Sequence, residues 1–171
     1  MDKQSFVKLY LPAARMAGDL YRINPVVILA QSAIETGWGE SALARQYNNF
    51  FGLTGYGVVN TYWHGGKVSL EENGLLFRRY DAPENSFLDF ARLISTAYRL
   101  AAAVSNYPAA YAREIAYSRY ISEVNGDNRA AYEEMLTRIA RSLMPLVEER
   151  LRQEGFCEER TRNVGLCTKK P

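Results

Sequence analysis

The sequence predicts a mainly α-helical (α+β) fold with one small β lobe inserted early. Apolar residues recur at helical spacing before residue 50 and again after residue 83. Residues 52–80, between them, are rich in Gly, Tyr, Val and Thr, with turn residues at 64–67 and 73–74, as in a hairpin or short meander. No repeat or linker divides the 171 residues. We therefore expect one domain over 1–171, with the β lobe at about 52–80 and a C-terminal tail at about 154–171.

Two helices are expected before the β lobe. Pro12 suits a first helical turn, and the alanine-rich segment after it places one apolar stripe on Ala13, Ala17, Leu20 and Tyr21. Asn24 followed by Pro25 is a strong start for a second helix, which should end at Gly37. Because this second helix is apolar nearly all round, it should be central.

After the β lobe the chain is expected to be helical again. The pattern predicts helices at about 86–104, 108–119 and 128–153. The last helix has Pro145 inside it, a candidate kink. Its buried stripe should consist of Tyr132, Met135, Leu136, Ile139, Leu143 and Leu146.

Composition excludes several classes of function. A net charge of +2 does not suggest a nucleic-acid partner. No apolar run approaches the roughly 18 residues of a membrane span, and the first twenty residues lack the apolar core of a secretory signal. The sequence also lacks a Ser/His/Asp arrangement, a phosphate loop and metal-ligand spacing. We therefore expect no cofactor and no metal.

The two cysteines, Cys157 and Cys167, both lie near the C-terminus. They are either unrelated thiols in a reducing compartment or a disulfide that closes a small loop and tethers the tail. With a single distant histidine, they fall short of the four ligands of a structural zinc site.

Glu35 is the candidate catalytic residue. It shares a helix face with Ile28 and Ser32, and it lies in the last turn, where the helix dipole disfavours a carboxylate. Apolar neighbours such as Trp38 would add desolvation of the same sign, keeping the carboxyl protonated as a general acid. Glycines on both sides of Trp38 would let a substrate approach closely. The alternative is an ordinary solvated surface glutamate.

The segment ILAQSAIETGWGES at 28–41, followed by NNFFGL at 48–53, resembles the glucosaminidase family of peptidoglycan hydrolases, glycoside hydrolase family 73. This family includes the cell-wall-cutting domain of flagellar rod-assembly proteins and many autolysins. The resemblance continues in FRRYDAPENSFLDFARL at 77–93 and, more faintly, in RYISEVNGDNRAAYEEML at 119–136. It therefore covers most of residues 6–143.

The resemblance implies a lysozyme-like helical domain with a small β-hairpin lobe. It implies an endo-β-N-acetylglucosaminidase, which hydrolyses the β-1,4 bond after N-acetylglucosamine in peptidoglycan glycan strands. It also implies that Glu35 is the general acid and that Tyr120 lies near the scissile sugar.

The second catalytic group is less clear. The family often carries a second glutamate in the hairpin after a threonine pair, but here the nearest match, NTYW at 60–63, has no acid. Glu71 and Glu72, further along the hairpin, are the closest candidates, although a charge pair beside a turn is normally just solvated. If neither is placed correctly, the N-acetyl group of the substrate can take this role.

Aromatic and amide side chains are candidates for binding the sugar. Tyr56, Tyr62 and Trp63 would line the groove, or they would stabilise the hairpin through cross-strand pairs. Trp38 is a further candidate beside Glu35. Asn49 would fix the loop at the floor of the cleft, or it would only adopt a turn.

Other functions and partners remain open. A muramidase or a lytic transglycosylase would share the fold and the single glutamate, and a non-catalytic wall-binding module would keep the fold alone. The chain shows neither a leader nor wall-binding repeats, which favours either an antibacterial effector that cuts the cell wall or a phage lysin. Such an effector would be made in the bacterial cytoplasm without a signal peptide and would act on periplasmic peptidoglycan, with a cognate immunity protein blocking the cleft.

Overall fold

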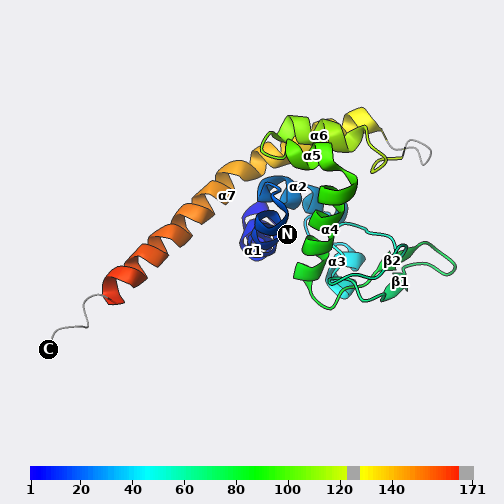
Figure 1. Ribbon diagram of the computed structural model, residues 1–171, viewed down its shortest axis with the longest axis horizontal. Helices are drawn as coiled ribbons and strands as arrows, with labels where there is room; N and C mark the ends of the chain where they lie inside the picture. The colour runs from blue at the N-terminus through cyan, green and yellow to red at the C-terminus, as the bar shows by residue number, and fades with distance from the viewer. Residues whose placement is uncertain (123–127, 166–171) are drawn as a thin grey trace.

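The computed structural model describes residues 1–122 and 128–165, with side chains described up to residue 155. β1 and β2 form an antiparallel two-stranded sheet in which Val68 pairs with Phe77. The predicted mainly helical fold with a small β lobe is confirmed (Figure 1). In chain order the elements are α1 (Lys3–Tyr21), α2 (Pro25–Thr36), α3 (Ala42–Tyr47), β1 (Lys67–Ser69), β2 (Leu76–Arg78), α4 (Pro83–Ala97), α5 (Arg99–Ala103), α6 (Pro108–Ala116) and α7 (Arg129–Gly165).

The central element is α2, as its apolar sequence predicts. Every residue from 26 to 33 is buried, and α2 packs against both α1 and α7. Asn24 caps its start, because the side-chain oxygen accepts a hydrogen bond from the Val26 amide at 2.9 Å. Pro25 occupies the first helical position, where its missing N–H costs nothing. The helix is thus a rigid mount for the residues in its last turn.

The end of α2 is a sharp left-handed turn. Gly37, Trp38 and Gly39 all have positive φ, at 56°, 63° and 79°, so glycine is favoured on both sides of the tryptophan. The turn is fixed by Thr36, whose hydroxyl donates to the Ser32 carbonyl at 2.6 Å and accepts from the Gly39 amide at 2.7 Å. The chain therefore leaves the helix immediately after Glu35 and doubles back.

The expected start of the first helix at Pro12 is wrong. Helix α1 begins at Lys3, and Asp2 caps it by accepting from the Ser5 amide at 3.0 Å. Pro12 lies inside α1 on its exposed side, where water can satisfy the carbonyl that the proline ring leaves unpaired. The expected stripe also fails at one position, because Leu20 is 60% exposed.

The later helices differ from the expected boundaries for local reasons. The helix expected at 86–104 is two, α4 and α5, because Tyr98 has φ −127° and ψ 52°. Helix α6 ends at Ala116 rather than at 119, and the Arg129 guanidinium donates to the carbonyls of Ala116 and Ser118 at 3.1 and 3.0 Å. Helix α7 continues to Gly165, beyond the expected end at 153, and includes Pro145.

The C-terminal part of α7 extends away from the other helices (Figure 1). At 37 residues and about 1.5 Å per residue, it is the longest described element. In the described part of the chain, none of the helices has both the length and the apolar surface that crossing a membrane requires.

One buried carboxylate joins the β lobe to the helices. Asp89 of α4 is fully buried and accepts four side-chain hydrogen bonds. From the β lobe, Arg78 donates at 2.5 Å, Tyr80 at 2.7 Å and Asn60 at 2.9 Å. From the next turn of α4, Arg92 donates at 2.9 Å. The charge is therefore fully compensated, which a buried carboxylate requires.

Arg78 extends this junction into the loop that precedes the hairpin. Its guanidinium also donates to the backbone carbonyls of Thr54 at 3.1 Å and Tyr56 at 2.7 Å. It lies over the Trp63 ring at 4.2 Å from the centroid. A single arginine thus links Asp89, the 54–56 backbone and the aromatic centre of the lobe.

We predict that Asp89→Ala lowers the free energy of unfolding by about 3–5 kcal/mol, because it leaves the Arg78 guanidinium buried without its counter-charge. Urea unfolding followed by circular dichroism measures this loss. Glu40→Gln is the matched control, because the ion pairs that Glu40 makes within the described part of the chain, with the N-terminus and with Arg45, lie at the surface. This variant should change the midpoint far less. A loss below about 1 kcal/mol for Asp89→Ala would contradict the prediction.

Candidate active site

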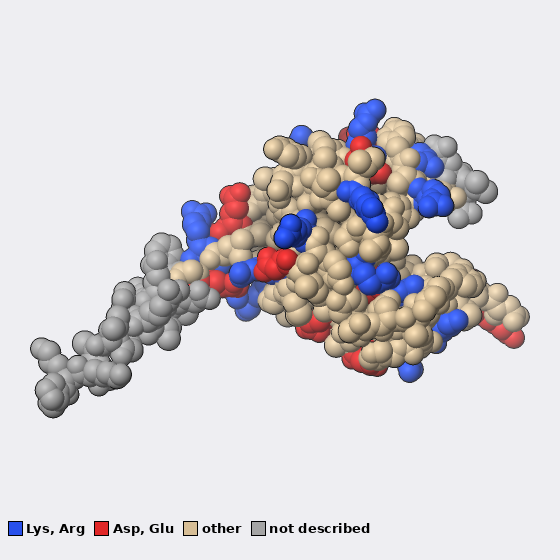
Figure 2. Space-filling view, in the orientation of Figure 1, with Lys and Arg blue, Asp and Glu red and all other residues tan. Residues whose placement is uncertain are grey.

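A cavity of about 680 Å³ lies where α2, the loop after Asn49, the α4–α5 junction and the start of α7 meet. Figure 2 shows the surface indented between the upper helices and the lobe that carries the hairpin. The described residues that line the cavity are Ile34, Glu35, Phe51, Gly52, Leu53, Thr54, Leu93, Tyr98, Arg119, Tyr120, Ile121, Asn128, Ala131, Tyr132 and Met135.

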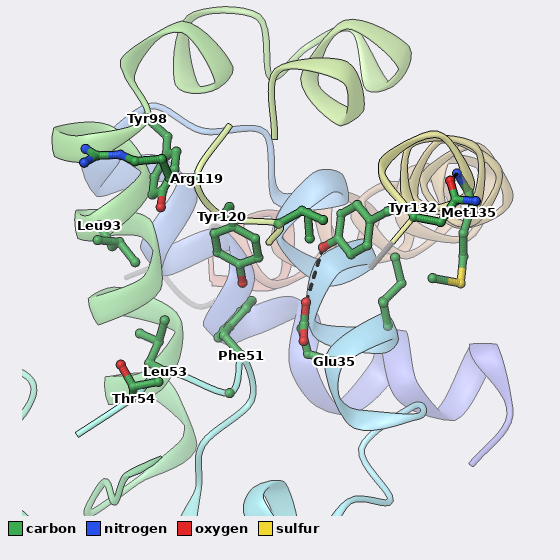
Figure 3. Close-up of a pocket in the computed structure, with 15 residues that line it drawn as sticks. Glu35, Phe51, Leu53, Thr54, Leu93, Tyr98, Arg119, Tyr120, Tyr132 and Met135 are labelled. Carbon is green, nitrogen blue, oxygen red and sulfur yellow. Dashed lines mark hydrogen bonds between the residues drawn. The ribbon is translucent and has the colours of Figure 1, made fainter. Parts of the chain in front are cut away.

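Glu35 is the only carboxylate among these described lining residues. It is half-buried in the last turn of α2. The Tyr132 hydroxyl donates a hydrogen bond to Glu35 Oε1 at 3.3 Å (Figure 3). Gly52 lies near Oε2, the other carboxyl oxygen of Glu35, because a Cβ added at Gly52 would be 3.9 Å from this atom. Since Gly52 also has φ +60°, a side chain there would be strained as well as close to the acid.

Two tyrosines from distant segments accompany Glu35. Figure 3 shows the rings of Tyr120 and Tyr132 with their hydroxyls on the side of Glu35. Burial raises the pKa of both phenols well above the usual value of 10, and the negative charge of Glu35 raises the pKa of each further. Both hydroxyls therefore stay protonated at neutral pH and remain hydrogen-bond donors.

The wall opposite α7 is a loop that Asn49 holds in place. The Asn49 amide donates to the carbonyls of Leu53 and Arg78 at 3.0 and 2.9 Å, and its oxygen accepts from the amides of Phe51 and Leu53. Asn49 is 1% exposed. Asn49 therefore holds the backbone of this loop in place from within the protein interior.

The aromatic rings of this wall are packed into the core. Phe51 stacks on Phe90 with ring centroids 3.8 Å apart, and Tyr120 meets the edge of Phe90 at 6.4 Å. Tyr120 also packs edge-on against Tyr98 at 5.8 Å. One aromatic cluster thus supports the loop and Tyr120 together.

The structure brings together only some of the residues expected at the site. Glu35 and Tyr120 line one cavity. Glu71 and Glu72 are exposed in the turn between β1 and β2 and are not among the lining residues. The hairpin therefore carries these two carboxylates away from Glu35.

The expected sugar-stacking aromatics also lie outside the cavity lining. Trp63 is 1% exposed and its indole N–H donates to the Gly66 carbonyl at 2.7 Å, which leaves no ring face for a sugar. Trp38 packs edge-on against Phe6 at 5.5 Å. Tyr62 shares a 2.7 Å hydrogen bond with Tyr21, and Tyr56 is 60% exposed on the β lobe.

Sequence reasoning did not find Tyr132, Tyr98 or Arg119 as site residues. The helical spacing predicts Tyr132 in the buried stripe of α7, and it does pack against the core. Its hydroxyl nevertheless reaches Glu35 from the first turn of the helix. The available signal was a residue with a polar tip on an otherwise aliphatic stripe, within the segment 119–136 that resembles the family.

The proposed disulfide lies outside the described residues, because Cys167 and the side chain of Cys157 are not described. It stays a prediction. Within the part of the chain that is described, no group of three His, Cys, Asp or Glu side chains is placed to hold a metal ion.

Residues 11–144 match the glucosaminidase family, described as mannosyl-glycoprotein endo-beta-N-acetylglucosaminidase. Over 105 residues the chain is 29% identical to the peptidoglycan hydrolase FlgJ of Vibrio parahaemolyticus, covering 54% of this chain and 33% of the relative. It is 50% identical over 40 residues to a putative endo-beta-N-acetylglucosaminidase of Streptococcus pneumoniae, covering 23% and 6%. The chain thus spans a third or less of the length of these relatives.

Two solved structures share the fold. The glycoside hydrolase domain of Salmonella typhimurium FlgJ matches with a TM-score of 0.66 at 22% identity. The match covers 94% of this chain and 99% of that domain's chain. A type VI secretion system effector–immunity complex from Pseudomonas protegens has a TM-score of 0.62 at 22% identity, covering 84% and 94%. At this identity the likeness concerns the fold alone.

The family match spans most of the chain, from within α1 into α7, and includes every residue that lines the cavity around Glu35. This chain belongs to the glucosaminidase family.

Proposed function

We propose that the chain is a peptidoglycan hydrolase, an endo-β-N-acetylglucosaminidase, in which Glu35 is the general acid. The observation that carries the proposal is the placement of Glu35 within the cavity, half-buried and hydrogen-bonded by a phenol that stays protonated. Family membership supports glycoside hydrolysis as the reaction, and the peptidoglycan hydrolase among the relatives supports the substrate.

The first chemical step is proton transfer to the leaving sugar. Glu35 Oε1 accepts a hydrogen bond from Tyr132, and Oε2 lies toward the backbone of Gly52. The Glu35 carboxyl gives its proton to the glycosidic oxygen as the bond from that oxygen to C1 of N-acetylglucosamine breaks. The resulting Glu35 carboxylate keeps the hydrogen bond from Tyr132, which stabilises the charge it has just acquired.

The substrate supplies the second group. The described lining offers no carboxylate besides Glu35, and a paired-carboxylate mechanism needs a second one about 5–9.5 Å away. The carbonyl oxygen of the substrate's own 2-acetamido group instead attacks C1 and forms a cyclic oxazolinium ion. Water, deprotonated by the Glu35 carboxylate, then opens this ion and leaves a reducing-end N-acetylglucosamine with retained configuration. Among the described residues, this lining favours the substrate-assisted alternative.

The biological setting is part of the proposal. We infer that the enzyme acts on peptidoglycan in the periplasm, as an antibacterial effector whose producer is protected by an immunity protein that covers the cavity. The fold shared with an effector from an effector–immunity complex supports this setting. A protein that blocks the cavity would inhibit cleavage without needing contacts to the far end of α7.

We predict that Glu35→Gln keeps the fold and lowers the rate of peptidoglycan cleavage roughly 100-fold or more, because glutamine has the shape of glutamic acid but no proton to transfer. Release of soluble fragments from purified peptidoglycan measures the rate, and circular dichroism checks the fold. Glu40→Gln, which changes an exposed glutamate outside the cavity, should cleave at the wild-type rate. A folded Glu35→Gln variant that cleaves as fast as this control would show that Glu35 is not the acid.

We predict that the double variant with Glu71→Gln and Glu72→Gln retains most of its activity, because both side chains are exposed in the hairpin turn. Under the same conditions, a thiazoline derived from N-acetylglucosamine should compete with the substrate, since it mimics the cyclic intermediate. Loss of activity in the double variant, together with no inhibition by the thiazoline, would replace substrate assistance with catalysis by a hairpin carboxylate.

Mass spectrometry of the products identifies the bond that is cut. We expect reducing-end N-acetylglucosamine, because the family that residues 11–144 match is described as an endo-beta-N-acetylglucosaminidase. Reducing-end N-acetylmuramic acid would instead identify a muramidase, and a 1,6-anhydro sugar would identify a lytic transglycosylase. Binding to peptidoglycan with no release of fragments would identify a wall-binding module.

A further inference from the structure

A fully buried amide lies directly behind the Tyr132–Glu35 contact. Gln31 is 0% exposed on α2, four residues before Glu35 and therefore on the same face of the helix. Its Nε2 donates to the Tyr132 hydroxyl at 3.4 Å, and its Oε1 accepts from the Tyr111 hydroxyl. A buried amide is costly unless its polar atoms are paired, and here both ends have a phenolic partner.

The order of these hydrogen bonds determines where the Tyr132 proton points. A phenol has one hydrogen. Because the Tyr132 oxygen accepts from the Gln31 amide, its own hydrogen is free for Glu35 Oε1, 3.3 Å away. If the Gln31 amide were turned over, Oε1 would face Tyr132 and would compete with Glu35 for that hydrogen.

Tyr111 is what keeps the amide from turning over. It is 0% exposed on α6, and burial raises its pKa well above the usual range, so its hydroxyl remains a donor that needs an acceptor. Gln31 Oε1 is that acceptor. With the amide reversed, the Gln31 N–H would point at Tyr111, and the Tyr111 hydrogen would lose the acceptor it has now.

We propose that Gln31 and Tyr111 are positioning residues that hold the Tyr132 hydrogen on Glu35 Oε1. The hydrogen bonds run in one direction, from Tyr111 through Gln31 and Tyr132 to Glu35 Oε1. They keep a donor on the carboxylate that forms once Glu35 has given up its proton. The inference rests on the proposed glycosidase function and adds residues that do not themselves line the cavity.

The test is a double-mutant cycle on kcat and KM with peptidoglycan. Gln31→Met keeps the side-chain length and removes both polar atoms, so kcat should fall roughly 10-fold or more, as for the loss of a hydrogen bond to a charged group, while KM changes little. Tyr132→Phe should lose a similar factor. Because Gln31 acts only through Tyr132, the double variant should be no worse than Tyr132→Phe alone.

Tyr111→Phe provides a second route to the same conclusion. This variant removes the hydroxyl that donates to Gln31 Oε1 but leaves the Gln31 amide in place. The kcat should therefore fall by a smaller factor than in Gln31→Met. Tyr111→Phe also carries the test if Gln31→Met fails to fold. Tyr21→Phe is the matched control, because the Tyr21 hydroxyl pairs with Tyr62 outside the cavity lining, and its kcat should equal that of the wild type.

Each outcome is decisive. Wild-type kcat in a folded Gln31→Met or Tyr111→Phe variant overturns the inference, as does an effect of Gln31→Met that simply multiplies that of Tyr132→Phe. A wild-type protein that never cleaves peptidoglycan overturns the proposed function and this inference with it. If Glu35→Gln abolishes cleavage and Gln31→Met leaves it intact, the proposed function stands and only this inference is overturned.

Discussion

The ionic contact between Arg78 and Asp89 is the constraint on which the rest of the structure depends. The β lobe has only two three-residue strands, and a hairpin of this size is marginal on its own in water. Its position comes instead from a buried carboxylate on α4 that accepts hydrogen bonds from Arg78, Tyr80 and Asn60. A charge removed from water tolerates little displacement of its partners, so the contact fixes the direction of the lobe as well as its attachment.

The cavity follows from that junction. Arg78 holds the backbone at Thr54 and Tyr56, and Asn49 holds the same loop from its other side. The loop thereby places Gly52 against the end of α2. The other wall comes from α7, which packs on α2 and brings Tyr132 to Glu35. The loop that carries Gly52 is thus held by side-chain hydrogen bonds to its backbone from two directions.

The architecture and the place of Glu35 in the cavity were predictable from sequence because both depend on local signals. Asn24–Pro25 and Gly37 define α2 through capping chemistry that any isolated helix obeys. Glu35 was identifiable because it lies in the last turn of an apolar helix and precedes a Gly–Trp–Gly turn. The start of α1 differs from the one expected at Pro12, because the Asp2 cap begins the helix earlier and the helix continues through Pro12.

The hydrogen bonds that lead to Glu35 from other helices were not predictable in the same way. Gln31 and Tyr111 meet through side chains on α2 and α6, 80 positions apart, and no local pattern records such a contact. Trp63 shows the opposite problem. An aromatic ring in a small β lobe looks available for a sugar, but the Arg78 guanidinium and the Gly66 carbonyl already occupy it. Whether an aromatic side chain is free depends on tertiary neighbours that periodicity does not reveal.

The separation of 97 positions between Glu35 and Tyr132 has a consequence for synthesis of the protein. A ribosome releases the acid-bearing helix long before it has made the first turn of α7, and contacts between distant positions form late and slowly. Until then, one wall of the cavity does not exist. A partly made chain therefore carries the glutamate without its phenol, and the complete constellation appears only when nearly the whole matched domain has emerged and folded.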